Sequence, residues 1–213
     1  MWGAAVRLDR SLSAFPVTAV AFVAIVPVEL PDKTFIATLV LSTRYRPLPV
    51  YLGVLAAFAV QCLVAVLAGA LLARLPERPV ALAAAALFAI GAVVLVRAAR
   101  KPETSEQETE QEYAEKLTAP RRGWHAATAS FLVLFTAEWG DLSQLLTAGL
   151  VAGGRPALPV FVGSWLGLAL VSGAAILLGR WLIKRVKLSV VRYVGAAVCG
   201  LLAILTVIEA LTR

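Results

Sequence analysis

Apolar residues fall into six long runs along this chain, and short polar or basic stretches separate the runs. The runs cover approximately residues 13–41, 49–73, 80–96, 125–151, 157–178 and 188–211. A helix needs roughly 17 to 25 apolar residues to cross the hydrocarbon core of a bilayer. The pattern therefore predicts an all-α polytopic membrane protein with six transmembrane helices.

Charged residues interrupt the middle of the first and the fourth run. Residues 29–34 read Glu-Leu-Pro-Asp-Lys-Thr and residues 138–144 read Glu-Trp-Gly-Asp-Leu-Ser-Gln, so one acid-x-x-acid-x-hydroxyl pattern occurs twice, once in each half of the chain. Pro27 and Pro31 each remove a backbone donor and disfavour helix in the residue before, which predicts a break in the first run. A spacing of three residues predicts that the two acids of each pattern share one helix face.

The two halves of the chain also resemble each other beyond these acids. Residues 48–53 (LPVYLG) match residues 158–163 (LPVFVG) at an offset of 110, and Gly69 matches Gly179. We therefore expect a first three-helix repeat at residues 1–98 and a second at 124–213, joined by an acidic linker at 99–123. Because three spans are an odd number, the second copy enters the membrane from the opposite side. The two copies then form an inverted repeat, on which many secondary transporters are built.

Lysine and arginine residues between the spans predict the orientation of the chain. The face with the linker holds thirteen of them, the face with both termini holds six, and Lys33 lies within a span. Positive residues concentrate on the cytoplasmic side of a membrane. We therefore expect the linker in the cytoplasm and both termini outside. The excess of arginine over lysine, fifteen to five, indicates a bacterial source and hence the inner (plasma) membrane.

Composition excludes several classes of function. With 60% hydrophobic and 15% charged residues, the chain is far more apolar than a soluble domain and leaves no room for one. The net charge of +7 comes from residues between the spans, so we expect no nucleic-acid partner. Cys62 and Cys199 stand singly in apolar runs, which favours a packing role. His125, the single histidine, lies at the end of a span, where contact with lipid headgroups is expected.

Four carboxylates inside the spans are the candidate functional groups. A charged carboxylate costs at least about 2.5 kcal/mol at the centre of a bilayer, so such groups face one another, a cavity or a cation. Inverted symmetry brings the two acid pairs together near the midplane of the membrane. The four acids are Glu29, Asp32, Glu138 and Asp141.

Neutral oxygens beside these acids complete a candidate metal site. Thr34, Ser143 and Gln144 supply hydroxyl and amide oxygens, and no cysteine or histidine follows the acids in either pattern. Such ligands suit the divalent cations Mn²⁺ and Ca²⁺ and disfavour zinc and copper. When the cation leaves, some of the crowded carboxylates must take protons. The sequence therefore predicts a secondary transporter that exchanges a divalent cation for protons, with no prosthetic group and no enzymatic reaction.

The two motifs resemble the paired E-x-G-D-[KR]-[ST] signatures of the manganese/calcium–proton antiporter family of Golgi, chloroplast and bacterial membranes. The resemblance covers the whole chain, with two three-span halves, a charged linker and one signature in the first span of each half. It implies a cation/proton antiporter, with manganese export as the usual bacterial role. The site residues that it carries over are Glu29, Asp32, Thr34, Glu138, Asp141, Ser143 and Gln144.

Two residues depart from the family's signature. Pro31 stands where the first signature has glycine, and Leu142 stands where the second has lysine or arginine. Pro31 keeps a helix-breaking residue but removes a backbone donor, and Leu142 removes a positive charge. Both departures bear on ion choice, affinity and coupling ratio.

Other interpretations of the same residues stay open at this point. An exporter of a small organic cation such as an amino acid would use the four acids to hold an ammonium group. An intramembrane aspartyl protease would use Asp32 and Asp141 as a dyad, but it would leave the glutamate of each pair without a role. In a purely structural reading, the acids only pair with Lys33 or form hydrogen bonds between helices. Lys33 itself either faces the site, where it would lower the net negative charge, or extends to the interface. Monomer and homo-oligomer both fit the sequence.

Three other polar residues in the spans have simpler interpretations. Gln61 and Ser172 are predicted to form hydrogen bonds between helices, and Glu209 is predicted to lie at the membrane interface.

Overall fold

The computed structural model describes residues 2–30, 33–100, 123–185 and 188–212, and within these ranges the chain is helical, with no strand. Most of the predicted linker therefore lies outside the described residues. The helices are α1 Trp2–Glu29, α2 Lys33–Arg44, α3 Pro47–Leu72, α4 Glu77–Ala99, α6 Trp124–Ala137, α7 Leu142–Ala152, α8 Ala157–Arg185 and α9 Leu188–Thr212.

Four of the predicted spans form long apolar helices. Residues 47–72, 78–99, 157–178 and 189–212 are each long and apolar enough to cross a membrane. The first and fourth runs behave differently, because each forms two shorter helices, α1 with α2 and α6 with α7. The break predicted in the first run is confirmed. The break in the fourth run was not predicted.

Local backbone chemistry explains the break between α6 and α7. Glu138 caps the C-terminus of α6 and Asp141 caps the N-terminus of α7, and Gly140 between them has a positive φ of 76°. Glycine adopts this left-handed conformation without the steric cost that a side chain brings. The prediction that Glu138 and Asp141 share one helix face is therefore wrong, since the two acids belong to different helices.

Pro27 does not interrupt the first run, although the sequence suggested that it would. Helix α1 continues through Pro27 and ends at Glu29, and α2 begins at Lys33. The acid motif itself, rather than Pro27, therefore marks the break.

The end of the fifth span also differs from the prediction. Helix α8 extends to Arg185, so most of the predicted basic turn after the fifth span has a helical backbone.

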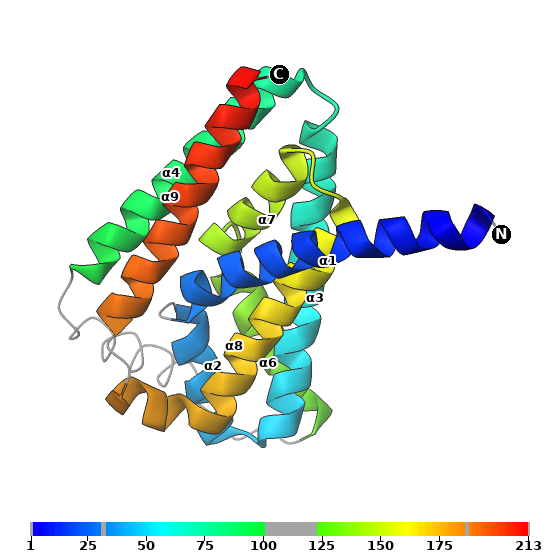
Figure 1. The fold of residues 1–213 in the computed structure, drawn as a ribbon. Helices are drawn as coiled ribbons and strands as arrows, with labels where there is room; N and C mark the ends of the chain where they lie inside the picture. Colours follow the sequence, from blue (N-terminus) through cyan, green and yellow to red (C-terminus); the bar gives the residue numbers. More distant parts are fainter. Residues whose placement is uncertain (1, 31–32, 101–122, 186–187, 213) are drawn as a thin grey trace.

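The halves of the chain are interleaved rather than separate. Figure 1 shows α4 and α9 side by side along much of their length, and this is the most extensive helix pair among the described residues. Helix α1 packs against α8, while α3 packs against α6, α7 and α8. Helix α2 also lies against α8. Each broken run is thus held mainly by a long helix from the other half.

Two glycines allow this close packing between the halves. A Cβ atom on Gly53 of α3 would collide with the main chain of Ala127 on α6, and one on Gly163 of α8 would collide with the main chain of Thr18 on α1. Gly53 corresponds to Gly163 in the repeat, and Thr18 corresponds to Ala127 at the offset that relates the two acid motifs. The two contacts therefore connect matching positions of the repeat found in the sequence.

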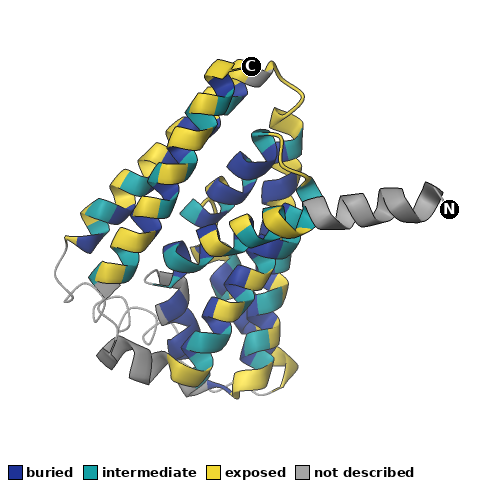
Figure 2. Cartoon of the chain, viewed as in Figure 1, coloured by how far each residue is buried: buried dark blue, intermediate teal, exposed yellow. Residues whose placement is uncertain are grey.

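Large apolar side chains cover the outside of the bundle as well as its core. Ile25, Phe58 and Leu134 are buried between helices, whereas Leu67 of α3 and Ile204 of α9 are more than half exposed. Figure 2 shows buried and exposed residues alternating around the same helices. An apolar surface of this kind is unfavourable in water but is expected for helices that face lipid.

Candidate cation site at the two helix breaks

Asp141 is held at the first turn of α7 by a network of local hydrogen bonds. Its Oδ1 accepts a hydrogen bond from the main-chain N–H of Gln144 at 3.0 Å, and its Oδ2 accepts one from the hydroxyl of Ser143 at 2.8 Å. Aspartate is among the preferred residues at a helix N-cap because its carboxylate satisfies otherwise orphan N–H groups. The carboxylate of Asp141 is therefore fixed in position before any ligand binds.

Gln144 bridges the break between α6 and α7. Its side-chain amide donates to the main-chain carbonyl of Glu138 at 2.9 Å, and its Oε1 accepts from the main-chain N–H of Gly140 at 3.2 Å. Main-chain groups at a helix break lose their regular helical partners and need others. Gln144 supplies two of these partners, so its role here is to shape the loop.

Glu29 and Glu138 occupy corresponding places in the two broken runs. Glu29 is the last residue of α1 and is fully buried, and Glu138 caps α6 and is 2% exposed. The C-terminal end of a helix carries a partial negative charge that favours nearby cations. Both acids thus add their charge to an end of a helix where a cation is already favoured.

Helix α3 brings side chains to both breaks. Gln61 is buried and donates its amide to the carbonyls of Phe135 at 3.2 Å and Leu134 at 3.4 Å, in the last turn of α6. This bond confirms the prediction that Gln61 connects helices. Cys62, the next residue, is buried in the hydrophobic core and lies within electrostatic range of both Asp141 and Glu29. Helix α3 therefore lies close to both acid motifs.

The predicted role of Ser172 is not confirmed. Its hydroxyl is buried and donates at 2.8 Å to the carbonyl of Leu168, one turn earlier in the same helix. A serine inside a helix commonly satisfies its hydroxyl in this way. Among the described residues, Ser172 therefore makes no hydrogen bond to another helix.

The described residues supply only part of the predicted ligand set. Glu29, Glu138, Asp141, Ser143 and Gln144 lie at or next to the two breaks. Within the described ranges, no three His, Cys, Asp or Glu side chains are grouped closely enough to hold a metal ion.

The remaining predicted ligands belong to the first motif. Asp32 lies outside the described residues. Thr34 and its neighbour Lys33 belong to α2, but their side chains are not among those that the structure describes.

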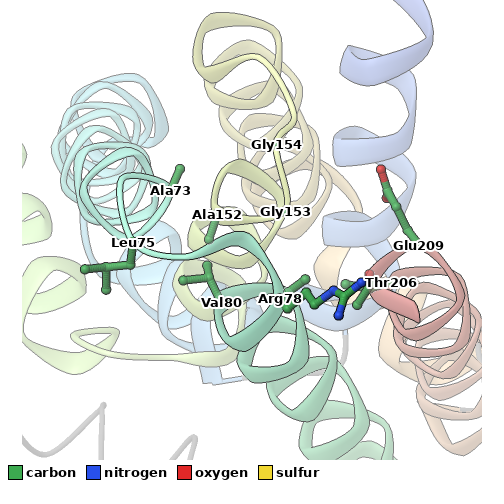
Figure 3. A pocket seen from close by; sticks show the side chains of 11 residues that line it. Ala73, Leu75, Arg78, Val80, Ala152, Gly153, Gly154, Thr206 and Glu209 are labelled. Carbon is green, nitrogen blue, oxygen red and sulfur yellow. The ribbon is translucent and has the colours of Figure 1, made fainter. Parts of the chain in front are cut away.

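Glu209 lies in a pocket at the opposite end of α7. Figure 3 shows this pocket between Arg78 at the start of α4, the turn at Gly153 and Gly154, and Thr206 and Glu209 near the end of α9. Asp141 caps the other end of α7, so Glu209 is separated from the helix breaks by the length of that helix. His125 is exposed at the start of α6.

Several residues near the site were not connected with it from the sequence. Cys62 lies in the hydrophobic core, as predicted, but nothing in its own run places it near an acid motif. Thr147 and Ser164, whose hydroxyls are 3.0 Å apart between α7 and α8, were not singled out. A signal for Thr147 was present, since it follows Ser143 by one helical turn and corresponds to Thr38 in the register of the acid motifs.

Comparison with known proteins finds a family model and several relatives that match most of the chain. The family model described as divalent cation/proton antiporter GDT1 matches residues 17–103 and 126–213. A GDT1-like protein of Synechocystis is 32% identical over 186 residues, which cover 84% of this chain and 90% of that protein. No solved structure is similar enough to match the chain.

Plant proteins match the chain over a smaller part of their own length. The chloroplastic GDT1-like protein 1 of Oryza sativa subsp. indica is 31% identical over 211 residues, which cover 90% of this chain and 61% of the rice protein. The chloroplastic PAM71-homolog protein of Arabidopsis thaliana is 28% identical over 201 residues, 83% of this chain and 55% of that protein. The chain therefore spans less than two thirds of either plant protein.

Proposed function

Because the chain belongs to the GDT1 family of divalent cation/proton antiporters, we propose that it exports Mn²⁺ in exchange for protons at a site between its two helix breaks. Ca²⁺ is the alternative cargo. The observation that carries this proposal is the matching burial of Glu29 and Glu138, each at the C-terminal end of the first helix of a broken run. Buried acids at such ends are expected to bind a cation or protons.

The proposed ligands are the acids and neutral oxygens of both motifs. Asp141 is already oriented by Ser143 and Gln144, and the first motif contributes Glu29, Asp32 and Thr34 in the same pattern. Carboxylate and hydroxyl oxygens are hard ligands that suit Mn²⁺ and Ca²⁺. When the cation is released, neighbouring carboxylates at membrane depth take up protons, and this exchange couples the two fluxes.

We further propose that each broken run acts as one membrane span, which gives six spans in two inverted three-helix repeats. The contact of Gly53 with Ala127 and that of Gly163 with Thr18 support this arrangement, because they join matching positions in opposite halves. Trp165 of α8 donates its indole N–H to the carbonyl of Leu55 on α3 at 3.1 Å, and these two residues themselves correspond in the repeat. In an inverted repeat, equivalent residues of the two copies contact each other at the two-fold axis that relates the copies.

The proposed orientation follows from the distribution of positive charge. The acidic linker lies in the cytoplasm, both termini lie outside, and the protein resides in a bacterial inner membrane. In this orientation the pocket at Glu209 opens near the outer face. Oligomerisation is not needed for the proposed site, since all its residues come from one chain.

Transport in proteoliposomes tests this function directly. The purified protein is reconstituted with an internal pH dye, and Mn²⁺ or Ca²⁺ uptake is followed with and without an imposed proton gradient. We expect movement of the metal coupled to opposite movement of protons, with Mn²⁺ preferred. Absence of both fluxes in well-inserted protein would overturn the proposal, and transport of organic cations alone would replace it with the exporter alternative.

Neutral variants of the acids test the site. Glu29→Gln, Glu138→Gln and Asp141→Asn should each lower transport by about a hundredfold or more, because the removed charge binds the cation in a poorly solvated place. Glu209→Gln is the matched control, since it removes an acid beyond the far end of α7. Normal transport by the first three variants, or an equal loss in the control, would contradict the assignment.

A further inference from the structure

A chain of buried hydroxyl groups connects α8 to the first turn of α7. The hydroxyl of Thr147 donates to the main-chain carbonyl of Ser143 at 2.8 Å, and the hydroxyls of Thr147 and Ser164 are 3.0 Å apart. Ser164 is fully buried, Thr147 is 1% exposed and Ser143 is 4% exposed. Each hydroxyl can donate one proton and accept another. Ser164 can therefore donate to Thr147 while Thr147 donates to Ser143.

This series of hydroxyl groups ends at the residues that orient Asp141. Ser143 donates its own hydroxyl to one carboxylate oxygen of Asp141, and the N–H of Gln144 is bonded to the other. Thr147 and Ser164 together hold the main chain of this first turn of α7. Hydrogen bonds that follow one another polarise and strengthen each other in a poorly solvated interior. The position of the Asp141 carboxylate thus depends on α8 as well as on α7.

The corresponding bond is missing from the described residues of the first half. Thr38 of α2 corresponds to Thr147 in the register of the acid motifs, and Val54 of α3 corresponds to Ser164 in the register of Gly53 and Gly163. Thr38 is fully buried, and its hydroxyl has no hydrogen-bond partner among the described residues. Val54 is also fully buried but has no polar side-chain atom to offer. At this pair of positions, the hydroxyl bond between a broken run and a long helix is therefore found in the second half only.

We propose that Thr147 and Ser164 are positioning residues that hold Asp141 for the transported cation, and that the equivalent threonine of the first half, Thr38, has no such role. This inference rests on the proposed cation site. Binding groups need to be held within a fraction of an ångström by their supporting contacts. The second acid motif is then the rigid side of the site, because α8 anchors it.

A pair of variants at Thr147 separates the hydroxyl from the packing. Thr147→Val keeps the shape of the side chain and removes the hydroxyl, whereas Thr147→Ser keeps the hydroxyl. We expect Thr147→Val to raise the KM for Mn²⁺ by about fivefold to tenfold, with the maximal rate changed by less than about twofold. Thr147→Ser should restore most of the affinity. Ser164→Ala removes the other hydroxyl and should raise the KM for Mn²⁺ as Thr147→Val does. It replaces Thr147→Val in the test if Thr147→Val does not insert into the membrane.

The matched control lies at the equivalent position of the other half. Thr38→Val makes the same substitution where the hydroxyl has no described partner, so its KM should equal that of the wild type and its thermal unfolding temperature should stay the same or rise. A wild-type KM for both Thr147→Val and Ser164→Ala would overturn the inference. An equal rise in KM for Thr38→Val would overturn it too, because the two halves would then be alike.

Failure of the proposed function would look different from failure of this inference. A wild-type protein that neither transports Mn²⁺ or Ca²⁺ nor unfolds at a higher temperature in their presence would refute the cation site itself. A wild-type protein that does both, with variants indistinguishable from it, would refute only the role of Thr147 and Ser164.

Discussion

The side-chain amide of Gln144 donates to the main-chain carbonyl of Glu138 across the break between α6 and α7, over a distance of 2.9 Å. The same side chain accepts from the N–H of Gly140. One residue thus closes the loop that separates the two acids of the second motif. The shape of this loop determines how far apart Glu138 and Asp141 stand.

Replacement of Gln144 should weaken the loop and the site together. Gln144→Ala removes two hydrogen bonds of about 1 kcal/mol each. We expect a loss of about 1–2 kcal/mol in the free energy of unfolding and a clear rise in the KM for Mn²⁺. Thermal unfolding in detergent and proteoliposome transport measure the two effects. Gln144→Glu keeps the acceptor for Gly140 but loses the donor to Glu138, so a variant as stable as the wild type would argue against the bridge.

Two substitutions at Asp141 should separate helix capping from cation binding. Asparagine caps a helix about as well as aspartate, whereas alanine does not, at a cost of about 1 kcal/mol. We expect Asp141→Asn to abolish transport with little change in the unfolding temperature, and Asp141→Ala to abolish transport and lower that temperature. Circular dichroism during heating, compared with transport, checks both. Retained transport in Asp141→Asn would show that capping is the main role of this residue.

Gly53 and Gly163 should be intolerant of any side chain. Gly53→Ala and Gly163→Ala place a Cβ against the main chain of a neighbouring helix, and overpacking of this kind costs typically about 1–3 kcal/mol. We expect both variants to unfold at lower temperature and to lose transport. Gly200 of α9 provides the control, because a Cβ there meets nothing within 4 Å. Gly200→Ala should be neutral or stabilising by up to about 1 kcal/mol, and equal effects at all three positions would contradict the packing described.

Gln61 should stabilise the end of α6 from a neighbouring helix. Its amide donates to the carbonyls of Phe135 and Leu134, in the last turn of α6, where carbonyls lack regular helical partners. We expect Gln61→Leu to lower the free energy of unfolding by about 1–2 kcal/mol and to weaken Mn²⁺ binding, because Glu138 caps the same helix end. Ser172→Ala, which removes a bond within α8 only, should have little effect on either measurement. Unchanged stability in Gln61→Leu would remove this residue from the support of the site.

Hydropathy and the order of polar residues were enough to predict much of this protein. Four long apolar helices follow the predicted runs within a few residues, and the break in the first run lies at the predicted acid cluster. These features depend on local composition, because a segment that lies in lipid must satisfy its own backbone and present apolar side chains. The two motifs also indicate the family, because their residues and spacing can be read directly from the sequence.

The second break shows where local patterns were insufficient. The run at residues 125–151 contains no proline, and the spacing of Glu138 and Asp141 fits one helix face. The structure instead uses Gly140, the cap at Asp141 and the bridge through Gln144 to end one helix and begin another. Each of these local features was visible in the sequence, but a continuous helix satisfied the same pattern.

What the sequence by itself determined is therefore the membrane class, the internal repeat of its motifs and the acids that lie at the helix breaks. The tertiary structure alone decided which residues from other helices surround them. Cys62 lies near both Glu29 and Asp141, Gln61 supports the end of α6, and Ser164 reaches Thr147, although most of these partners are far apart in the sequence. The physical reason is that such contacts depend on which faces of long helices meet. They also depend on Gly53 and Gly163, which let two helix backbones approach closely. Apolar helices without a distinct polar face carry little record of that choice in their own sequence.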